Sequence, residues 1–536
     1  MGEPPKLSIA ARPGPQRPQY NAAQDLLERN ILAGRGEKIA YIDEAGGYTY
    51  CELADRADRC AVVLLTLGIQ AEQRIALCLL DTIDFPACFL GAIKVGIVPI
   101  PLNTLLQPPD YAFILSDSRA KAIIVSQPLL PAILEAIRIA GWHGEIIVSG
   151  EPPSDFPALA DLTHAAHGGI PAAPTLPDDV CFWLYSSGST GRPKGTVHLQ
   201  TSMVRTAELF AQEVLGLRES DVIYSTAKLF FAYGLGNSLS FPLATGATSI
   251  LYSGRPTTKA VGELLSKFKP TIFCSVPTMF SSLLASPDHP PREELALRLC
   301  TSAGEALPEE IGRSWEACTG VEIVDGIGST EMLHIFLSNR PGACRYGTTG
   351  KPVPGYKVRL LDEKDHEVSP GEMGDLYVSG PTSAAYYWNN REKTQATFLG
   401  EWVKTGDRFR QNADGDYVYC GRSDEMLKVG GVWVSPTEVE SALISHHAVL
   451  EAAVVGALDD NELVKPKAYV VLKPDVKPRT ELALELRSFV KSRLAPYKCP
   501  RWIEFVDQLP KTATGKIRRN VLRMSANERR DKVRGA

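Results

Sequence analysis

The sequence predicts an α/β protein with a large N-terminal domain, residues 1–423, and a small mobile α+β C-terminal domain, residues 424–536. Two observations lead to this prediction. Short apolar runs alternate with helical stretches over much of the first half, and the composition changes after Arg422. Such alternation is typical of parallel sheets covered by helices. A chain of 536 residues is also long enough for more than one domain.

The first α/β region lies between Arg74 and Ser149. Apolar runs predict strands over residues 74–80, 97–102, 121–126 and 145–149, and helical stretches ending near Lys94 and spanning 111–117. Residues 1–20 are rich in proline and lack an apolar signal core, so we expect a loose arm there. Residues 151–178 are rich in Pro, Ala and His and are expected to form a surface linker.

Further strands are expected over residues 222–227, 247–252 and 271–276. The sequence pattern then changes to short predicted strands, such as 358–361 and 375–379, separated by polar turns. We therefore expect the N-terminal domain to consist of stacked α/β sheets plus a small β subdomain over about 345–423.

The C-terminal domain opens on a helix signal. Ser435 suits an N-cap, Pro436 the first helical position, and Glu438 the third position of a capping box. A strand over 468–472, a helix over 481–494 and a strand over 502–506 should follow. Residues 511–536 carry nine Lys and Arg, which indicates either a solvated tail or a segment that helps to hold an anionic cofactor.

Composition excludes several classes of function. The net charge of −5 gives no basic field for nucleic acid. No apolar run approaches the ~18 residues of a membrane span, so no membrane partner is expected. The 11 cysteines are scattered without a C-x-x-C pair, which favours a reduced, cytoplasmic protein over a disulfide framework or a zinc site.

One stretch, Tyr185 to Gly195, has the composition of a phosphate-binding loop. An apolar run precedes it, and apolar residues at helical spacing follow from Met203 to Val214, so we expect a strand, the loop and soon afterwards a helix. The loop offers backbone N–H groups, small hydroxyls and the Lys194 ammonium, which together suit a polyphosphate. It is not a Walker A loop, because a glycine follows Lys194. The alternative is a flexible surface loop.

Five further motifs follow downstream in a fixed order. They are Ser302-Ala303-Gly304-Glu305, Gly328-Ser329-Thr330-Glu331, Lys404-Thr405-Gly406-Asp407, Gly421-Arg422-x-Asp424 with Lys428-x-Gly430-Gly431, and Pro510-Lys511-Thr512-Ala513-Thr514-Gly515-Lys516. With the loop, they make nearly the whole chain resemble the acyl-adenylate-forming superfamily of acyl-CoA synthetases, peptide-synthetase adenylation domains and luciferases. The resemblance implies that a carboxylate attacks the α-phosphorus of ATP, pyrophosphate leaves, and an acyl-AMP forms.

The resemblance also implies a nucleotide site. The phosphates would be held by Ser186, Ser187, Gly188, Ser189, Thr190, Gly191 and Lys194, of which Thr190 and Lys194 are candidate catalytic residues. Thr330 would contact the α-phosphate and Glu331 would hold Mg²⁺. The rest of the site would comprise Ala303, Gly304, Glu305, Ala306, Asp325, Gly326, Ile327, Gly328 and Ser329 around the base, and Asp407 and Arg422 at the ribose. Ile327 replaces an aromatic residue that the family often stacks on adenine.

By the same resemblance, Lys516 would bridge the carboxylate and the α-phosphate during adenylation. A lysine acetyltransferase acting on Lys516 is a partner that the family implies. Asp424 falls at the family hinge. After adenylation the C-terminal domain would turn there, removing Lys516 and bringing Lys428, Gly430 and Gly431 to the thiol of coenzyme A.

Two stretches, Lys228 to Asn237 and Gly326 to His334, look like the benzoate–CoA ligase branch. The resemblance implies an acid pocket of Phe231, Ala232, Tyr233, Ala303, Gly326, Gly328, Leu333 and His334, with Phe231 at the gate. Small residues beside aromatic ones suit a flat ring. The alternative for Phe231 and Tyr233 is core packing, and His334 is either a core histidine or a contact to a ring substituent.

We therefore expect an ATP- and Mg²⁺-dependent ligase that joins benzoate, or a hydroxy- or amino-benzoate, to CoA. One alternative is a freestanding adenylation enzyme that loads an aryl acid onto a carrier protein. Another is a non-catalytic sensor. The partners expected are the acid, ATP and CoA, with the chain a monomer or a homodimer.

Overall fold

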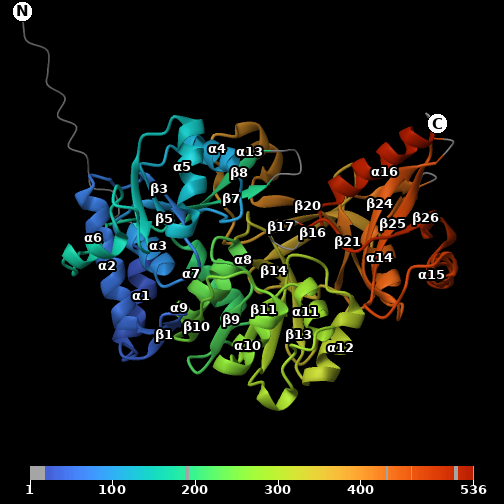
Figure 1. Cartoon of the computed structure of the whole chain (residues 1–536), viewed down its shortest axis with the longest axis horizontal. Helices are drawn as coiled ribbons and strands as arrows, with labels where there is room; N and C mark the ends of the chain where they lie inside the picture. Colours follow the sequence, from blue (N-terminus) through green and yellow to red (C-terminus); the bar gives the residue numbers. More distant parts are fainter. Residues whose placement is uncertain (1–17, 188–191, 430–431, 460–461, 512–516, 535–536) are drawn as a thin grey trace, which may run out of the picture.

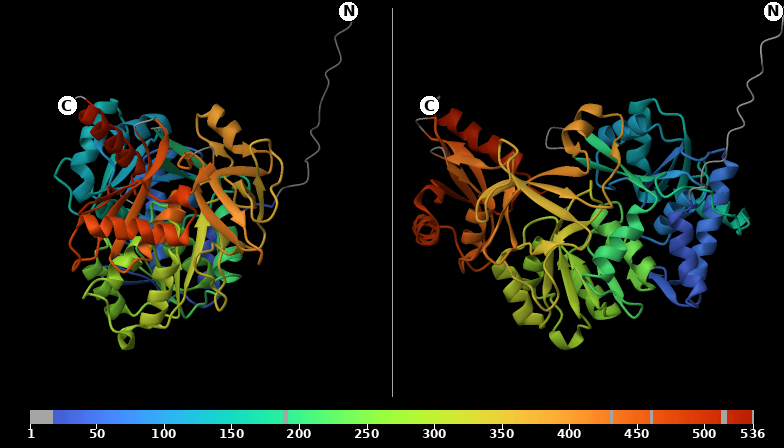
Figure 2. Two further views of the ribbon diagram at one scale, coloured as in Figure 1. Left: turned by 90° about the vertical axis from the view of Figure 1, so that its right-hand side faces the viewer. Right: turned by 180° about the vertical axis from the view of Figure 1, so that it is seen from behind.

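The computed structural model describes residues 18–187, 192–429, 432–459, 462–511 and 517–534, with side chains up to residue 526. Two masses stand side by side in Figure 1. The larger part contains the elements up to β21, and the smaller part contains the C-terminal elements that follow, from β22 to the red helix α16. The view from behind in Figure 2 shows the same separation.

A four-stranded parallel sheet, in the order β4-β3-β5-β6, forms one layer of the larger mass. Its strands are β3 (Arg74–Cys78), β4 (Val98–Pro101), β5 (Ala122–Ser126) and β6 (Glu145–Ser149). The connecting helices include α3 (Asp84–Lys94), α4 (Pro108–Ser118) and α5 (Leu130–Ala140). All four strands lie where the apolar runs predict them, because a strand buried on both faces is apolar throughout.

A nine-stranded sheet, in the order β15-β14-β13-β12-β11-β9-β10-β1-β2, forms the second layer. Its strands are β1 (Ile39–Ile42), β2 (Gly47–Thr49), β9 (Val222–Ser225), β10 (Thr248–Ile250), β11 (Ile272–Ser275), β12 (Leu299–Ser302), β13 (Ile323–Gly328), β14 (Ile335–Ser338) and β15 (Lys351–Pro352). The pairs from β13 through β12, β11, β9 and β10 to β1 are parallel. The carboxyl ends of β12 and β13 therefore lie beside each other, where parallel sheets usually bind ligands.

The predicted phosphate loop connects two antiparallel strands, β7 (Val180–Ser187) and β8 (Pro193–Leu199). A short strand, β18 (Tyr386–Tyr387), pairs with the outer edge of β8. The helix expected after the loop begins only after β8, as α7 (Ser202–Thr206) followed by a π-helix over Ala207–Gln212. The prediction missed β8, whose apolar alternation over seven residues is too short to stand out.

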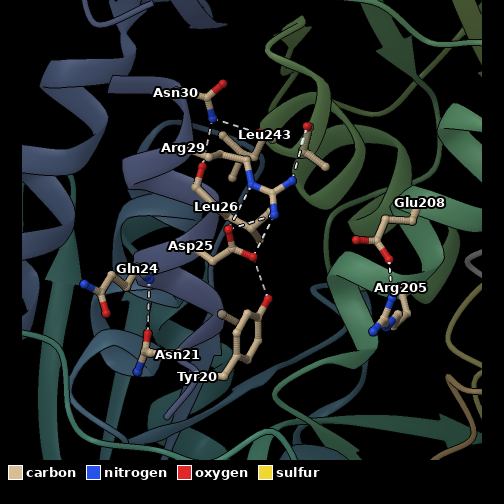
Figure 3. Close-up of polar contacts among 12 residues, drawn as sticks. Tyr20, Asn21, Gln24, Asp25, Leu26, Arg29, Asn30, Arg205, Glu208 and Leu243 are labelled. Atoms are coloured by element: carbon tan, nitrogen blue, oxygen red, sulfur yellow. Dashed lines mark hydrogen bonds and ion pairs between the residues drawn. The ribbon is translucent and has the colours of Figure 1, made fainter. Parts of the chain in front are cut away.

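Helix α1 (Ala22–Leu32) ties the N-terminal segment to the large domain. Its N-cap Asn21 accepts a hydrogen bond from the Gln24 amide at 3.1 Å, and the Tyr20 hydroxyl donates to Asp25. Figure 3 shows this cluster and the amide of Asn30 directed at the carbonyl of Leu243 in α9 (Phe241–Thr245). The loose arm expected over residues 1–20 is therefore wrong at Tyr20, while residues 1–17 lie outside the description. The linker expected over 151–178 also contains a helix, α6 (Leu159–Ala165).

The β subdomain is a five-stranded antiparallel sheet. Its strands lie in the order β16 (Lys357–Leu361), β17 (Met373–Ser379), β20 (Trp402–Gln411) and β19 (Phe398–Leu399). Strand β21 (Tyr417–Arg422) also pairs with β20. Helix α13 (Arg391–Thr397) precedes β19.

The C-terminal part is α+β, as predicted. It contains the hairpin β22 (Leu427–Val429) with β23 (Val432–Val434) and the sheet β24 (Val449–Leu458), β25 (Val464–Leu472) and β26 (Trp502–Phe505), with α14 (Pro436–Ile444) and α15 (Thr480–Arg493). Ser435 caps α14 by accepting from the Glu438 amide. The Glu438 carboxylate does not complete the capping box, because it binds the Lys498 ammonium at 2.6 Å instead. No apolar core cluster of the described residues spans both sides of Asp424.

The basic tail is mostly helical. Helix α16 (Arg519–Arg534) packs Leu522 and Ala526 into the C-terminal core. Arg519 lies 17% exposed against Glu440, at 2.8 Å. The alternative of a solvated tail is therefore wrong for the first half of this helix. None of the helices that the structure describes is both long and apolar enough to span a membrane.

Candidate active site

A largely buried cluster of three side chains lies at the base of the hairpin formed by β7 and β8, which contains the predicted phosphate loop. The Lys194 ammonium is 3.0 Å from Glu331 Oε1 and donates to the Tyr387 hydroxyl at 2.7 Å. Tyr387 in turn donates to Glu331 Oε1 at 2.6 Å. Burial alone would raise the pKa of Glu331, but the Lys194 charge and the Tyr387 hydrogen bond outweigh burial and lower it. The carboxylate is therefore ionised at neutral pH.

The hairpin brings two of the predicted phosphate contacts together. Ser186 lies opposite Lys194 in the register of β7 and β8. The Ser186 hydroxyl is buried, with no hydrogen-bond partner among the described residues. The other predicted contacts Gly188, Ser189, Thr190 and Gly191 lie outside the described residues, and Ser187 is described only in its backbone.

The ends of β12 and β13 supply the predicted base-binding residues. Ser302 pairs with Asp325 across the two parallel strands, and Ala303 follows at the strand end. Burial raises the pKa of the Asp325 carboxyl well above its usual value, which favours the neutral, proton-bearing form. A neutral carboxyl can donate as well as accept a hydrogen bond. Such a carboxyl can form a hydrogen bond with either a donor or an acceptor on the edge of a nucleobase.

The glycines of β13 are required by its antiparallel neighbour β14. A Cβ atom added at Gly328 would lie 2.4 Å from the His334 carbonyl oxygen, and one at Gly326 would lie 2.8 Å from Ile335 Cγ2. Gly304, after β12, has a φ of +94°, which a side chain would strain. These three positions therefore have a packing or backbone reason to be glycine besides any contact to a ligand.

The loop between β13 and β14 connects the buried charge cluster to an aromatic region. The Ser329 hydroxyl accepts from the Met332 amide at 3.2 Å, and the Thr330 carbonyl accepts from the Leu333 amide. Leu333 has a φ of +66°, a left-handed conformation that costs a branched residue energy. The tight turn places Glu331 and His334 at opposite ends of a very short segment.

The aromatic region contains the predicted acid-pocket residues. The His334 ring lies among three others, with centroids 4.5 Å from Phe241, 5.4 Å from Tyr233 and 5.5 Å from Phe210. The Tyr233 hydroxyl shares a hydrogen bond with Thr301 Oγ1 at 2.6 Å. Phe231 immediately precedes helix α8 (Ala232–Leu235), and all three residues Phe231, Ala232 and Tyr233 are partly exposed.

The protonation of His334 follows from its surroundings. Burial lowers the pKa of His334 to about 3, so the ring is neutral at pH 7. Its Nε2 lies 3.3 Å from the Tyr233 carbonyl oxygen. Because a carbonyl only accepts, Nε2 carries the hydrogen and Nδ1 presents a lone pair. The three packed rings and the fixed tautomer favour the interpretation of His334 as a core histidine that forms part of the wall of the predicted pocket.

Two glycines of the predicted pocket segment allow close packing. A Cβ at Gly234 would lie 2.0 Å from the Lys228 carbonyl oxygen, and a Cβ at Gly236 would lie 2.3 Å from His334 Cδ2. Both contacts are far shorter than a Cβ tolerates. The close approach of α8 to the Lys228 turn and to His334 therefore depends on glycine.

The predicted ribose contacts meet across β20 and β21. Asp407 and Arg422 are register partners, with Arg422 Nη1 3.2 Å from Asp407 Oδ1 and 3.0 Å from the Thr405 carbonyl. Arg422 Nε lies 3.7 Å from Asp424, the predicted hinge residue, whose side chain is 48% exposed. The guanidinium thus connects the predicted ribose contact to the predicted hinge.

The C-terminal part contacts the predicted base-binding segment. The amide of Ile517 donates to Glu305 Oε1 at 3.3 Å. Ile517 directly follows Lys516, which itself lies outside the described residues. Of the predicted CoA-step residues, Lys428 is exposed with its ammonium 5.3 Å from the Trp433 ring centre, and Gly430 and Gly431 lie outside the description.

Sequence reasoning missed Tyr387 and Thr301. Tyr387 is 2% exposed and closes the Lys194–Glu331 cluster, and Thr301 fixes the Tyr233 hydroxyl. Neither stands in one of the recognised motifs. The only signal in the sequence is that Tyr387 lies in an aromatic run, Tyr386-Tyr387-Trp388, within the polar β subdomain.

The residues present fit a magnesium ion. Mg²⁺ in nucleotide sites usually takes one or two carboxylates and completes its shell with phosphates and water. Glu331 is a single ionised carboxylate at the hairpin base, which matches that donor set. Among the described residues, no group of three His, Cys, Asp or Glu side chains forms a closed metal cage.

The chain matches two family models, the AMP-binding enzyme family over residues 27–388 and the AMP-binding enzyme C-terminal domain over residues 438–516. It is 58% identical to a benzoate–CoA ligase of Thauera aromatica, covering 97% of each chain. It is 48% identical to a 4-hydroxybenzoate–CoA/benzoate–CoA ligase of Rhodopseudomonas palustris, covering 94% of each.

Solved structures agree. A benzoate CoA ligase from Burkholderia xenovorans LB400 matches with a TM-score of 0.89 at 53% identity, over 94% of this chain and 100% of that one. An anthranilate CoA ligase solved in complex with anthranoyl-AMP matches with a TM-score of 0.92 at 43% identity, over 96% of this chain and 99% of that one. These matches confirm the predicted fold class and the family. The chain belongs to the AMP-binding enzyme family, and within it to the benzoate–CoA ligase branch.

Proposed function

We propose that this protein is an AMP-forming ligase that joins an aromatic carboxylic acid to coenzyme A. The acid is benzoate or a benzoate with a small hydroxyl or amino substituent. ATP activates the carboxylate as an acyl-AMP with release of pyrophosphate, and the thiol of coenzyme A then displaces AMP. The relatives at 58% and 48% identity are CoA ligases for benzoate and for 4-hydroxybenzoate or benzoate, which supports the aromatic class.

One observation carries the proposal. The loop after β13 carries a largely buried, ionised carboxylate, Glu331, that contacts Lys194 of the β7–β8 hairpin, and the loop ends at His334 in the aromatic region. Only two residues separate them. An aromatic acid lying against Tyr233 and His334 would therefore have its carboxylate directed toward the phosphates of a nucleotide at Lys194. This proximity is what an attack of carboxylate on phosphorus requires.

We assign the following roles to the residues of this chain. The hairpin from Ser186 to Lys194 holds the β- and γ-phosphates, Asp407 and Arg422 hold the ribose, and the ends of β12 and β13 hold the base. Lys516 neutralises the meeting anions. Mg²⁺, held by Glu331, would neutralise charge on the phosphates.

The acid pocket is lined by side chains that suit a ring. Phe231, Ala232 and Tyr233 come from the start of α8, Ala303, Gly326 and Gly328 from the sheet, and Leu333 and His334 from the following loop. The neutral His334 ring and the apolar neighbours Phe210 and Phe241 favour a flat, uncharged ring.

We further propose that residues 1–423 and 424–536 act as separate bodies that turn about Asp424. Separate apolar cores on the two sides support this division. The 11 unpaired cysteines support a reducing, cytoplasmic location. Acetylation of Lys516 by a lysine acetyltransferase would remove the positive charge and stop adenylation. The resting assembly is a monomer or a homodimer.

A single assay tests the function. The protein is incubated with ATP, Mg²⁺ and a panel of benzoates, with and without coenzyme A, while pyrophosphate and thioester are measured. We expect pyrophosphate release and a thioester with benzoate. Pyrophosphate without any thioester would indicate an adenylation enzyme that loads a carrier protein, and no pyrophosphate with any acid would indicate a sensor.

A further inference from the structure

We propose that Tyr387 is a positioning residue for the metal-binding carboxylate, and that it keeps Glu331 directed when Lys194 turns to the phosphates of ATP. This inference rests on the proposed function, because it takes the roles of Lys194 and Glu331 from it. It goes beyond that function in assigning a role to a residue outside the recognised nucleotide and acid motifs.

The hydroxyl of Tyr387 both donates and accepts a hydrogen bond within the cluster. It donates its one hydrogen to Glu331 Oε1 at 2.6 Å and accepts from the Lys194 ammonium at 2.7 Å. Lys194 also contacts the same carboxylate oxygen at 3.0 Å. Two donors thus share one carboxylate oxygen in a largely buried place, where hydrogen bonds to charge are strongest.

The Tyr387 ring is fixed from several sides. It is 2% exposed, and its centroid lies 5.2 Å from the Phe398 ring in an edge-to-face arrangement. Its strand β18 pairs with β8, so that Tyr387 lies opposite Thr196. The amide of the next residue, Trp388, donates to the Gly195 carbonyl at 2.8 Å. The hydroxyl therefore has one position relative to the hairpin.

The backbone of Glu331 is anchored to the same segment. The Ala384 amide donates to the Glu331 carbonyl oxygen at 2.7 Å. Residues 384–388 thus fasten both the hairpin base and the carboxylate. A carboxylate held at its main chain and at one oxygen keeps its second oxygen in a fixed direction.

The charge balance explains why the hydroxyl is needed. In this structure the Lys194 ammonium balances the negative charge of the Glu331 carboxylate. A bound triphosphate carries more negative charge and would attract the same ammonium. When the ammonium leaves, a buried carboxylate without a donor is costly. The neutral Tyr387 hydroxyl is not drawn to phosphate in the same way, so it remains as the donor to Oε1.

The test compares Tyr387→Phe with a matched control, Tyr386→Phe. Tyr386 is the neighbouring residue on the same short strand, but it is 37% exposed and lies outside the cluster. Binding of ATP is measured by calorimetry over a Mg²⁺ titration, without any acid and again with EDTA. Mg²⁺ half-saturation of pyrophosphate release with benzoate is measured in parallel, together with the thermal unfolding midpoint.

We expect Tyr387→Phe to raise the Mg²⁺ concentration needed for half-saturation by about tenfold or more, because one hydrogen bond to a charged group is lost. Binding of ATP in EDTA, the KM for benzoate and the unfolding midpoint should stay near wild type, and Tyr386→Phe should match wild type throughout. In a Glu331→Gln background, Tyr387→Phe should add little, because both changes act on one contact.

Two results would overturn the inference alone. One is a wild-type Mg²⁺ dependence in an active Tyr387→Phe variant. The other is an equal loss of ATP affinity with and without Mg²⁺, which would assign Tyr387 a general structural role. A wild-type protein that neither binds ATP nor releases pyrophosphate would instead refute the proposed function itself. If Tyr387→Phe does not fold, the double-variant comparison is made with Tyr387→His, which retains a donor and should keep part of the Mg²⁺ affinity.

Discussion

At the scale of single residues, the proposed acid pocket depends on where a few aromatic side chains are held. Tyr233 is fixed by its hydrogen bond to Thr301, and its ring contacts His334. Phe231 packs against Phe230 with centroids 4.3 Å apart. The side chains at these positions therefore set the width of the pocket.

We predict that Phe231→Ala and Tyr233→Ala each change the ratio of kcat/KM between benzoate and a substituted benzoate by about tenfold or more. The KM for ATP should stay near wild type, because neither ring belongs to the nucleotide site. Steady-state kinetics over the acid panel measures both. Tyr48→Ala, on the edge strand β2 at the far end of the sheet, is the control. An unchanged acid profile in both variants would remove these rings from the pocket.

His334 should also make stability depend on pH. Burial lowers the pKa of His334 from 6.5 to about 3, so the folded protein cannot take up the proton that the unfolded chain binds below pH 6.5. The stabilisation is complete above that pH and is lost as the pH falls toward 3. Between pH 7 and pH 5 the loss should be about 2 kcal/mol.

The measurement is the urea midpoint of wild type and His334→Gln at both pH values. The variant should lose less stability on acidification, whatever its stability at pH 7. The comparison between chains is needed because Asp81 acts in the opposite direction: burial raises its pKa from 3.8 to about 6, so protonation stabilises the fold in the same range. Identical acid sensitivity in the two chains would contradict the prediction.

Tyr387 illustrates what the sequence could not supply at this scale. Motif order identified Lys194 and Glu331, which the structure brings to 3.0 Å. Tyr387, which contacts both side chains, comes from a strand more than fifty residues after Glu331 in the chain. Nothing in local pattern distinguishes it from Tyr386, because only the pairing of β18 with β8 determines which of the two faces inward.

At the scale of elements, helix α16 is held to the C-terminal part by a buried ion pair. Arg519 contacts Glu440 at 2.8 Å and Glu425 at 3.4 Å, and Glu440 also accepts from the Val454 amide. Removing one partner would leave an uncompensated buried carboxylate. The pair therefore fixes the helix that directly follows the segment of Lys516.

We predict that Arg519→Met lowers the free energy of unfolding of the C-terminal part by about 3–5 kcal/mol. The control is Arg205→Met, which breaks an ion pair with Glu208 at 2.8 Å whose side chains are 54% and 38% exposed (Figure 3). Surface pairs of this kind contribute about 0–1 kcal/mol. Urea denaturation of both variants measures the difference, and similar small losses would show that the Arg519 pair is not structurally important.

The elements that the sequence predicted share one property. The parallel strands β3 to β6, β9 and β11 are mostly apolar, and the predicted ranges match them to within a few residues at each end. Other elements were missed. Strand β24 is apolar except for Glu451 but contains three alanines and one glycine, which are poor strand formers, and the start of α16 carries charges that are paired only through the tertiary fold. Local pattern cannot reveal a partner that lies on another element.

At the scale of the whole molecule, the C-terminal part contacts the proposed nucleotide region through the residue after Lys516. The Ile517 amide donates to Glu305, Arg408 lies over the Trp433 ring, and the two parts have separate apolar cores. Such contacts between parts with separate cores are consistent with the proposal that the C-terminal part turns between half-reactions.

We predict that Lys516→Ala lowers pyrophosphate release by about 10²-fold or more, since it removes the charge that neutralises the two anions. Thioester formation from supplied benzoyl-AMP should stay within a few-fold of wild type. Lys428→Ala should show the reverse pattern. Stopped-flow assays of each half-reaction measure this. Equal losses in both half-reactions for both variants would refute the alternating arrangement.

Gly234 in helix α8 and Gly236 directly after it determine how the proposed acid pocket can be redesigned. Because any side chain at Gly234 or Gly236 collides with the Lys228 carbonyl or with His334, mutant libraries aimed at new acids should keep both glycines unchanged. Diversity belongs instead at Phe231 and Ala232, which are partly exposed. Larger acids will need a smaller residue at one of the aromatic positions. Helix α8 cannot move closer to the Lys228 turn, because Gly234 already brings the two backbones into close contact.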